Sequence, residues 1–281
     1  MTQEVFQTKE GVKYLTEPHV VRLASTQMRN GDDWYGWKSE VYDFLEGITD
    51  DFVDYVKDKN IDNASQLIKL AGQLCYMSFG EKRTWNKDAD KYINHIILSR
   101  HGSVLEHYNV TFLFYGISRS LTHELVRHRH FSFSQVSQRY VGPNILRFVE
   151  RPEYQKSKIL HEAFEHHIND VSKWYQEYIE SIEDSYRNDS EYQNLSLVER
   201  RKALQQQARS VLPNDTEAPI IVTGNLRAWR HFIEERGSKY AEPEIHALAV
   251  SVLFSLVEVA PLIFADYHYV DGNIETEYRK V

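Results

Sequence analysis

Residues 127–140 carry more polar chemistry than a core segment would. They hold three arginines, two histidines, three serines and two glutamines. A guanidinium group offers a fixed fork of N–H donors that matches phosphate, carboxylate and carbonyl oxygens, and its charge does not titrate near neutral pH. The segment therefore predicts a binding site for an oxygen-rich anion. The alternative is a solvated basic helix end, where arginine is favourable anyway, followed by an edge strand.

Within this segment Phe131 and Phe133 alternate with Ser132 and Ser134. Alternation with a period of two is typical of an extended chain and places aromatic rings on one face and hydroxyls on the other. Arg127 precedes the alternation at the end of a helical pattern. The sequence thus predicts a helix that delivers its last turn directly into a strand.

The order Arg127-His128-Arg129, then seven residues, then Ser137, with Arg139-Tyr140 close behind, resembles the signature of the flavin-dependent thymidylate synthases. The resemblance extends over roughly residues 20–261. It implies an α+β fold: a single domain spanning 1–281, with a central antiparallel or mixed sheet flanked by long helices. Residues 30–60 would then be an insertion.

The same resemblance implies an activity and its partners. Members of this family methylate dUMP reductively to dTMP, with 5,10-methylenetetrahydrofolate as carbon donor and NADPH as the reductant of a bound FAD. They are homotetramers whose active sites form where subunits meet. The protein would then bind and orient its ligands, while the cofactor carries the redox chemistry.

The family's functional positions transfer to this chain residue by residue. Arg236 would be catalytic, stabilising negative charge that develops at N3 and O2 of uracil, so that no covalent attack by the enzyme is needed. The FAD contacts would be Ser103, Arg127, His128, Arg129, Gln135, Asn225, Leu226, Arg227 and His231. The dUMP contacts would be Glu124, Leu125, Val126, Arg127, Gln135, Val136, Ser137, Gln138, Arg139, Arg209 and Arg236.

The residues themselves leave alternatives open at several of these positions. Arg227 and His231 are four apart on one helix face, where an anion or a flavin edge could bind near the free amides of the first turn. Glu234 and Glu235 could instead pair with these arginines on a solvated face. Likewise, Ser103 could be an ordinary turn serine, and Arg209 a helix C-terminal cation.

Two other reactive residue types are interpreted as structural. Cys75 falls on the apolar face of a predicted helix with Leu67, Leu70, Ala71 and Leu74, so we expect a buried thiol that packs and is not a nucleophile. Ser137 is also not expected to be a nucleophile. His123 and His128 are five apart and do not share a helix face, which argues against zinc. We expect His123 and His130 to be hydrogen-bonded packing residues.

Periodicity predicts the elements that must position these side chains. Gly237 is expected to close its helix as a C′ glycine. The predicted strands are 20–24, 110–115 and 219–223, and the predicted helices are 64–76, 88–99, 118–129 with Ser118 as N-cap, 160–182, 196–209, 225–236 and 243–261.

Composition narrows the class of protein. With 33 basic and 41 acidic side chains the net charge is −8, which argues against a general nucleic-acid binder. A single cysteine fits a reducing compartment, so a cytoplasmic location is expected. No apolar run approaches the length of a membrane span.

Two other classes of function stay open. One is a nucleotide-binding regulator that keeps the pocket without turnover. The other is an RNA-contacting module, since arginine and phenylalanine planes can stack on bases; the acidic net charge counts against it.

Overall fold

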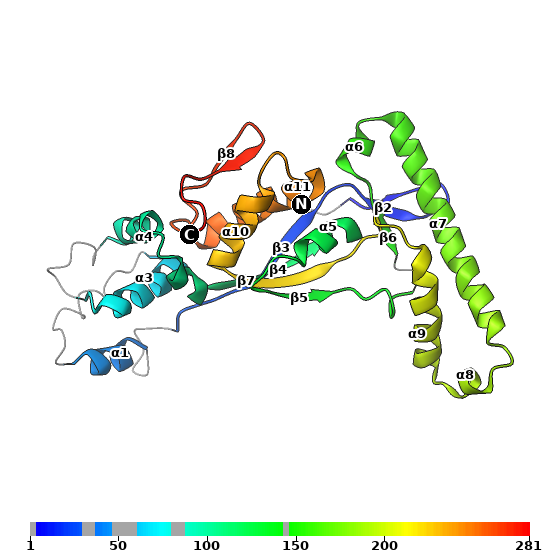
Figure 1. Ribbon diagram of the computed structural model, residues 1–281, viewed down its shortest axis with the longest axis horizontal. Helices are drawn as coiled ribbons and strands as arrows, with labels where there is room; N and C mark the ends of the chain where they lie inside the picture. Colours follow the sequence, from blue (N-terminus) through cyan, green and yellow to red (C-terminus); the bar gives the residue numbers. More distant parts are fainter. Residues whose placement is uncertain (1–3, 30–36, 47–60, 80–87, 143–145) are drawn as a thin grey trace.

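An antiparallel sheet forms the centre of the computed structural model, which describes residues 4–29, 37–46, 61–79, 88–142 and 146–281 (Figure 1). Within these residues the strand order is β3-β4-β7-β5. The order makes β5 an edge strand. The alternative interpretation of residues 127–140, a basic helix end followed by an edge strand, predicted this position. The strands are β3 (His19–Ser25), β4 (Asn109–Tyr115), β7 (Ile220–Asn225) and β5 (Phe131–Gln135).

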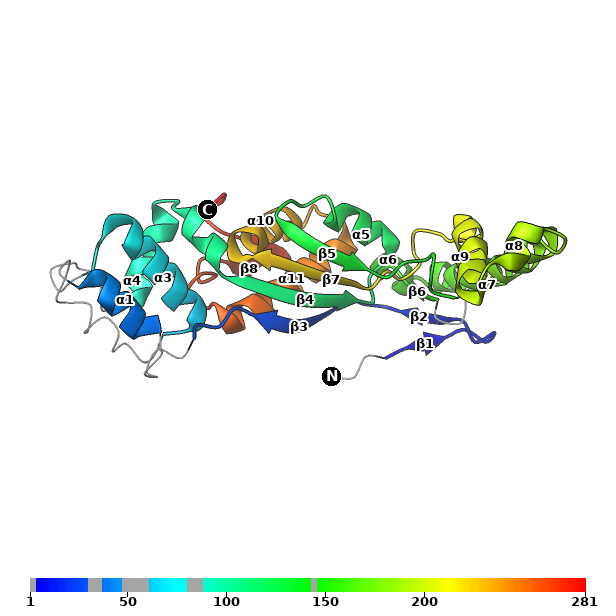
Figure 2. The ribbon, with the colours of Figure 1, turned by 90° about the horizontal axis from the view of Figure 1, so that it is seen from below.

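Helices α10 (Leu226–Arg236) and α11 (Pro243–Val259) lie against one face of this sheet (Figure 2). Alternate residues of β4 point into that layer, and the ring of Phe112 meets that of Trp229 edge-on at 5.1 Å. The opposite face carries Val21 and Ile221, each 39% exposed. The sheet is therefore apolar on both sides, although only one side forms the core.

Helix α5 (Arg119–Leu125) begins as predicted, because the side chain of Ser118 accepts a hydrogen bond from the backbone N–H of Leu121. It ends at Leu125, four residues before the predicted boundary at 129. In β5 the two phenylalanines pack against the core and the two serines are exposed, so the predicted alternation is confirmed. Phe131 lies opposite Gly224 of β7.

A helical layer with α1 (Trp37–Leu45), α3 (Asn63–Tyr76), α4 (Ala89–Leu98) and the 3-10 helix η1 (Gly102–His107) forms one end of the molecule (Figure 1). The predicted face of α3 is only partly correct: Leu67, Leu70 and Ala71 pack against buried residues, whereas Leu74 and Cys75 are exposed. A Cβ on Gly72 would lie 2.5 Å from the hydroxyl of Tyr92, so α3 approaches α4 through its small residues instead. The buried residues of α3 are Ala64, Ser65, Ile68, Lys69, Gly72 and Gln73.

The other end is built on the 28-residue helix α7, which runs beside α9 (Figure 1). A second core forms there around Tyr14, Phe148 and Phe164. The elements of this end are β1 (Phe6–Gln7), β2 (Lys13–Leu15), β6 (Arg147–Val149), α6 (Pro152–Gln155), α7 (Lys158–Ser185), α8 (Ser190–Asn194), α9 (Leu197–Ala208) and the 3-10 helix η3 (Arg209–Val211).

Gly237 ends α10 with φ −77°, so it is not the left-handed C′ glycine that was predicted. Its role is steric, because a Cβ there would lie 2.7 Å from the side chain of Ile274. Ile274 belongs to a short hairpin formed by β8 (His268–Val270) and β9 (Asn273–Glu275). The chain folds this hairpin back over the end of α10.

The architecture confirms the α+β class with a central antiparallel sheet. Most of the predicted insertion at 30–60 lies outside the described residues, and the described part of it contains α1. In the part of the chain that the structure describes, no helix is both long and apolar enough to cross a membrane.

Candidate active site

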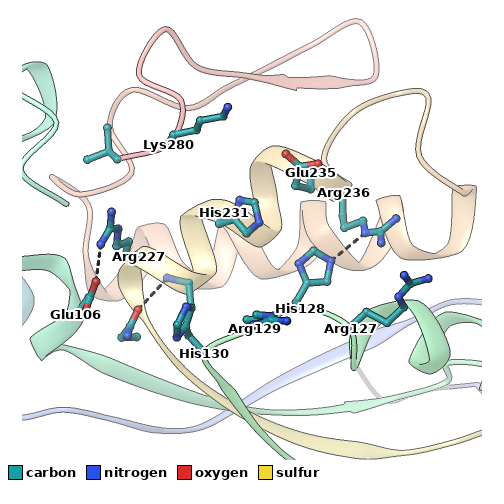
Figure 3. Close-up of a pocket in the computed structure, with 13 residues that line it drawn as sticks. Glu106, Arg127, His128, Arg129, His130, Arg227, His231, Glu235, Arg236 and Lys280 are labelled. Atoms are coloured by element: carbon teal, nitrogen blue, oxygen red, sulfur yellow. Dashed lines mark hydrogen bonds and ion pairs between the residues drawn. The ribbon is translucent and has the colours of Figure 1, made fainter. Parts of the chain in front are cut away.

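A cavity of about 920 Å³ opens between the end of α5 and the exposed face of α10 (Figure 3). Most of its polar side chains are basic, which suits an anionic ligand. Seven predicted site residues line it: Arg127, His128, Arg129, Asn225, Arg227, His231 and Arg236. The other lining residues are Glu106, His130, Ala228, Glu235, Lys280 and Val281.

The first turn of α10 supplies one wall of this cavity. The Asn225 side chain caps the helix by accepting a 2.8 Å hydrogen bond from the N–H of Ala228. Arg227 and His231 both line the cavity, as their spacing predicted. Arg227 pairs with Glu106 of η1 at 2.6 Å, an exposed ion pair worth about 0–1 kcal/mol.

The two acids that could have paired with these arginines pair elsewhere. Glu235 lies 3.7 Å from Arg279. Glu234 is buried, and its carboxylate accepts a 3.1 Å hydrogen bond from the hydroxyl of Tyr267. Arg227 therefore keeps its place at the cavity without either acid.

The connection between α5 and β5 forms the second wall. Two turn-like hydrogen bonds continue past the end of α5, from the N–H of Arg127 to Glu124 and from the N–H of His128 to Leu125. His130 then takes a left-handed conformation with φ 68°, which turns the chain into β5. Both Arg127 and Arg129 are exposed at the cavity.

Arg236, on the last turn of α10, is held from two sides. Its Nη1 donates to a Glu124 carboxylate oxygen at 2.6 Å, and its Nε donates to Nε2 of His128 at 3.0 Å. Figure 3 shows the second of these bonds. A guanidinium group has five N–H donors, so three remain for a ligand.

His128 must be neutral to accept this bond. Burial, and next the positive charges of Arg236 and His231, lower the pKa of His128 from 6.5 to about 4. Its Nε2 therefore carries a lone pair at neutral pH, and the proton resides on Nδ1. The imidazole is a fixed acceptor that orients the arginine.

The other predicted dUMP contacts lie away from this cavity. Ser137 accepts a 3.3 Å hydrogen bond from the N–H of Arg139, whose side chain reaches Gln206 of α9 at 3.3 Å. Arg209 is exposed in η3, which directly follows α9. Val136 and Gln138 line a second cavity of about 550 Å³ beside Arg147 and Glu217.

Five further predicted residues take other positions. The side chain of Gln135 donates to the hydroxyl of Thr122 at 3.3 Å. Leu125 and Leu226 are fully buried in the core. Ser103 is exposed on η1, and Val126 is 41% exposed just after α5.

Two structural interpretations of reactive residues are wrong. Cys75 is exposed and does not line the cavity, so it is not the packed thiol that was expected. His123 and His130 are also exposed, and His130 belongs to the cavity wall. Among the residues that the structure describes, no group of three or more His, Cys, Asp or Glu side chains could hold a metal ion.

Sequence reasoning missed the wall formed by Lys280 and Val281. No periodic pattern or motif marks these residues, and their contacts with α10 span more than forty positions of sequence. Only the fold brings them to the cavity.

Comparison with known proteins gives a family match over most of the chain. Residues 56–262 match the model of the family described as "Thymidylate synthase complementing protein". This range contains every predicted site residue and ends before Lys280.

The chain also resembles curated proteins named flavin-dependent thymidylate synthase. One from Mycobacterium sp. (strain JLS) is 44% identical over 206 residues, which cover 73% of this chain and 81% of the relative. Another, from Corynebacterium diphtheriae, is 40% identical over 225 residues, which cover 79% of this chain and 87% of the relative.

A solved structure has a similar fold. A UMP/dUMP methylase, PolB from Streptomyces cacaoi, bound with 5-Br dUMP, aligns with a TM-score of 0.58. The alignment covers 89% of this chain and 94% of PolB, at 18% identity. At that identity the likeness concerns the fold alone.

Proposed function

This chain belongs to the family of flavin-dependent thymidylate synthases, and from that premise we propose that it methylates dUMP reductively to dTMP with FAD as its cofactor. The carbon donor is 5,10-methylenetetrahydrofolate and the reductant is NADPH. The observation that carries the proposal is the basic cavity that seven of the predicted site residues line together.

The cavity suits a flavin dinucleotide in size and charge. Its volume of about 920 Å³ lies near the upper end of the usual range of ligand pockets, about 300–1,000 Å³. Arg127 and Arg129 face it with no carboxylate partner among the described residues, so their charge is free for phosphate oxygens. When bound, FAD supplies hydride transfer, and the protein residues supply position and charge.

Arg236 is the proposed catalytic residue. Its three free N–H donors can meet O2 and the N3 side of a uracil ring, where negative charge develops as the ring carbon becomes nucleophilic. A fixed donor aimed at developing charge stabilises a transition state more than a mobile one does, because it needs no reorganisation. Glu124 and His128 provide that fixation at 2.6 and 3.0 Å.

The remaining dUMP contacts support a homotetramer with shared sites. Ser137, Arg139 and Arg209 lie toward the α9 end, outside the cavity that holds Arg236. A second copy of the chain can bring such residues to the cavity. The half-exposed Val21 and Ile221 on the open sheet face supply apolar surface for such an interface.

The visible spectrum of the purified protein tests the cofactor first. We expect flavin bands that bleach on anaerobic addition of NADPH, and bleach faster with dUMP present. A protein without flavin bands, even after reconstitution with FAD, would contradict the proposal. Formation of dTMP from dUMP and methylenetetrahydrofolate is the direct assay.

Substitution of Arg236 tests the mechanism. We expect Arg236→Ala to lower kcat about 10²- to 10³-fold while FAD still binds, because the lost donor acts on the transition state. The matched control is Arg187→Ala, since Arg187 pairs with Asp184 on the outer end of α7. Wild-type turnover by Arg236→Ala, with flavin and dUMP bound, would refute the role.

A further inference from the structure

Residues 263–281, here called the return segment, lead from the end of α11 back across α10 to the cavity (Figure 1). The segment contains the β8–β9 hairpin, turned by the left-handed pair Asp271 and Gly272. It delivers Lys280 and Val281 to the cavity wall. The family match ends at residue 262, so this part of the wall has no predicted role.

A buried arginine fixes the segment to α10. Arg230 is completely buried and donates to both carboxylate oxygens of Asp266, at 2.7 and 2.8 Å. It also donates to the carbonyl oxygens of Ile263 and Tyr278. A buried charge of this kind is tolerated only when it is paired and hydrogen-bonded, so Arg230 holds both ends of the segment in place.

A buried carboxylate fixes the residue that reaches the cavity. Both oxygens of Glu234 accept from the backbone N–H of Lys280, at 3.0 and 3.3 Å. Lys280 is held there in a left-handed conformation with φ 63°, which is unfavourable for a residue with a Cβ. The hydrogen bonds to Glu234 stabilise this conformation, so the direction of Lys280 is determined by α10.

Glycine at position 102 lets the segment come close to the cavity corner. A Cβ at Gly102 would lie 2.4 Å from the backbone carbonyl carbon of Val281 and 3.0 Å from Nε of Arg227. The return segment, η1 and the first turn of α10 therefore meet in direct contact. Lys280 sits beside residues already proposed to bind the flavin.

Three basic side chains at the cavity have no carboxylate partner among the residues that the structure describes: Arg127, Arg129 and Lys280. In the view of Figure 3 Lys280 lies above α10, and Arg127 and Arg129 lie below it. A ligand that meets all three must be extended and carry negative charge. A dinucleotide with a diphosphate in its middle has both properties.

We propose that Lys280 is a cofactor-binding residue whose ammonium group contacts the diphosphate of FAD, and that the return segment exists in this chain to present it. The inference rests on the proposed function for the identity of the ligand. It does not depend on the reaction, because it concerns only the binding of a diphosphate.

The test compares Lys280→Met with Lys239→Met in the full chain. Methionine keeps the length of the side chain and removes its charge. Lys239 is exposed and lies over the ring of Tyr240, outside the cavity, so it controls for loss of a surface charge. Three probes are titrated against each apoprotein: FAD, riboflavin, which has no phosphate, and inorganic pyrophosphate.

We expect Lys280→Met to weaken FAD and pyrophosphate binding about three- to tenfold at low salt, with riboflavin affinity unchanged. The FAD difference should shrink in 1 M NaCl, because salt screens an exposed charge. Lys239→Met should match the wild type throughout.

The other outcomes separate this inference from the proposed function. Equal FAD and pyrophosphate affinities in Lys280→Met and Lys239→Met would overturn the role of Lys280. An equal loss of riboflavin binding would also overturn it, since the residue would then act by packing. A wild-type protein that binds pyrophosphate through Lys280 but never binds FAD would support the cation site and refute the flavin assignment.

Discussion

Arg236 donates in two directions, to an acid and to a neutral imidazole, and the two partners do different things. Glu124 balances part of the guanidinium charge, at an N···O distance of 2.6 Å. His128 adds no charge and fixes the plane of the group through Nε. The arginine is thus oriented in advance while three donors stay available, which is the arrangement that favours transition-state stabilisation.

The neutral state of His128 leads to a prediction about pH. In the unfolded chain this histidine gains a proton as pH falls through 6.5, whereas in the folded protein it does so only near 4. The unfolded state therefore binds more protons between these values, and the free energy of unfolding falls as pH drops from 6.5 to 4. We expect His128→Gln to flatten this part of the stability curve, measured by urea unfolding.

His161 supplies the control, because its pKa is shifted the other way. The hydrogen bond that Nδ1 of His161 donates to the carboxylate of Glu150 raises the pKa of His161 above 6.5. Its contribution to stability is complete below 6.5 and is lost as pH rises through the folded pKa. His161→Gln should thus lower the free energy of unfolding by a constant amount below pH 6.5 and change the slope of the curve only above pH 6.5. An acid limb that is the same in His128→Gln as in the wild type would show that His128 is not held neutral.

At the scale of elements, glycines determine how closely the elements of the site approach one another. A Cβ at Gly224 would lie 2.3 Å from the ring of Phe131, which faces it across the β5–β7 pair. The same ring packs on Trp229, with the centroids 4.5 Å apart. A side chain at position 224 would therefore overlap the ring of Phe131 and strain the pairing of β5 with β7.

Gly224→Ala tests this arrangement. We expect about 1–3 kcal/mol of destabilisation from overpacking. The melting temperature should fall by about 2–4 °C for each kcal/mol. FAD affinity should fall too, because Arg127 and Arg129 lead directly into β5. Gly142→Ala is the control, since the Cβ would meet only the flexible end of Gln205 at 3.3 Å. A stable Gly224→Ala variant with normal FAD affinity would contradict this account.

Local sequence patterns predicted some of these elements correctly and others incorrectly. Local patterns predicted β5 from its alternating phenylalanines and serines, and α5 from the Ser118 cap. For α3 they predicted the helix but misplaced the end of its buried face, because Gly72 brings the helix against Tyr92 and Cys75 is left exposed. Steric fit between two helices is not visible in the period of one of them.

In the candidate site, too, some residues could be predicted from the local sequence and others could not. The spacing of Arg227 and His231 predicted one wall because both residues lie on one helix. Lys280 depends on a hydrogen bond to a carboxylate 46 positions earlier, which no local pattern encodes. Motif and periodicity therefore identify residues within an element, and the fold decides which distant residues join them.

At the scale of the whole molecule, the chain is elongated: α5 and α10 lie near the middle, and helices α7 and α9, here called the arm, form one end (Figure 1). The basic cavity lies between the end of α5 and α10. Of the residues predicted to contact dUMP, Arg236 lies in the cavity, whereas Arg209 lies in η3, which directly follows α9. In a homotetramer with closed symmetry, each arm can serve the cavity of a neighbour. In such an assembly the arm would span the interface between two protomers.

If Arg209 and Arg236 of one active site come from different protomers, two variants that each lack one of these arginines can together assemble working sites. Arg209→Ala and Arg236→Ala should each retain little activity alone. Co-expressed in equal amounts, they should assemble so that about one quarter of the sites contain both native arginines, if these come from different protomers. The measurement is dTMP formation by the co-expressed protein. The control is a mixture of the two variants that are purified separately and pooled without exchange of protomers. A mixed assembly as inactive as its parents would place both arginines in one protomer's own site.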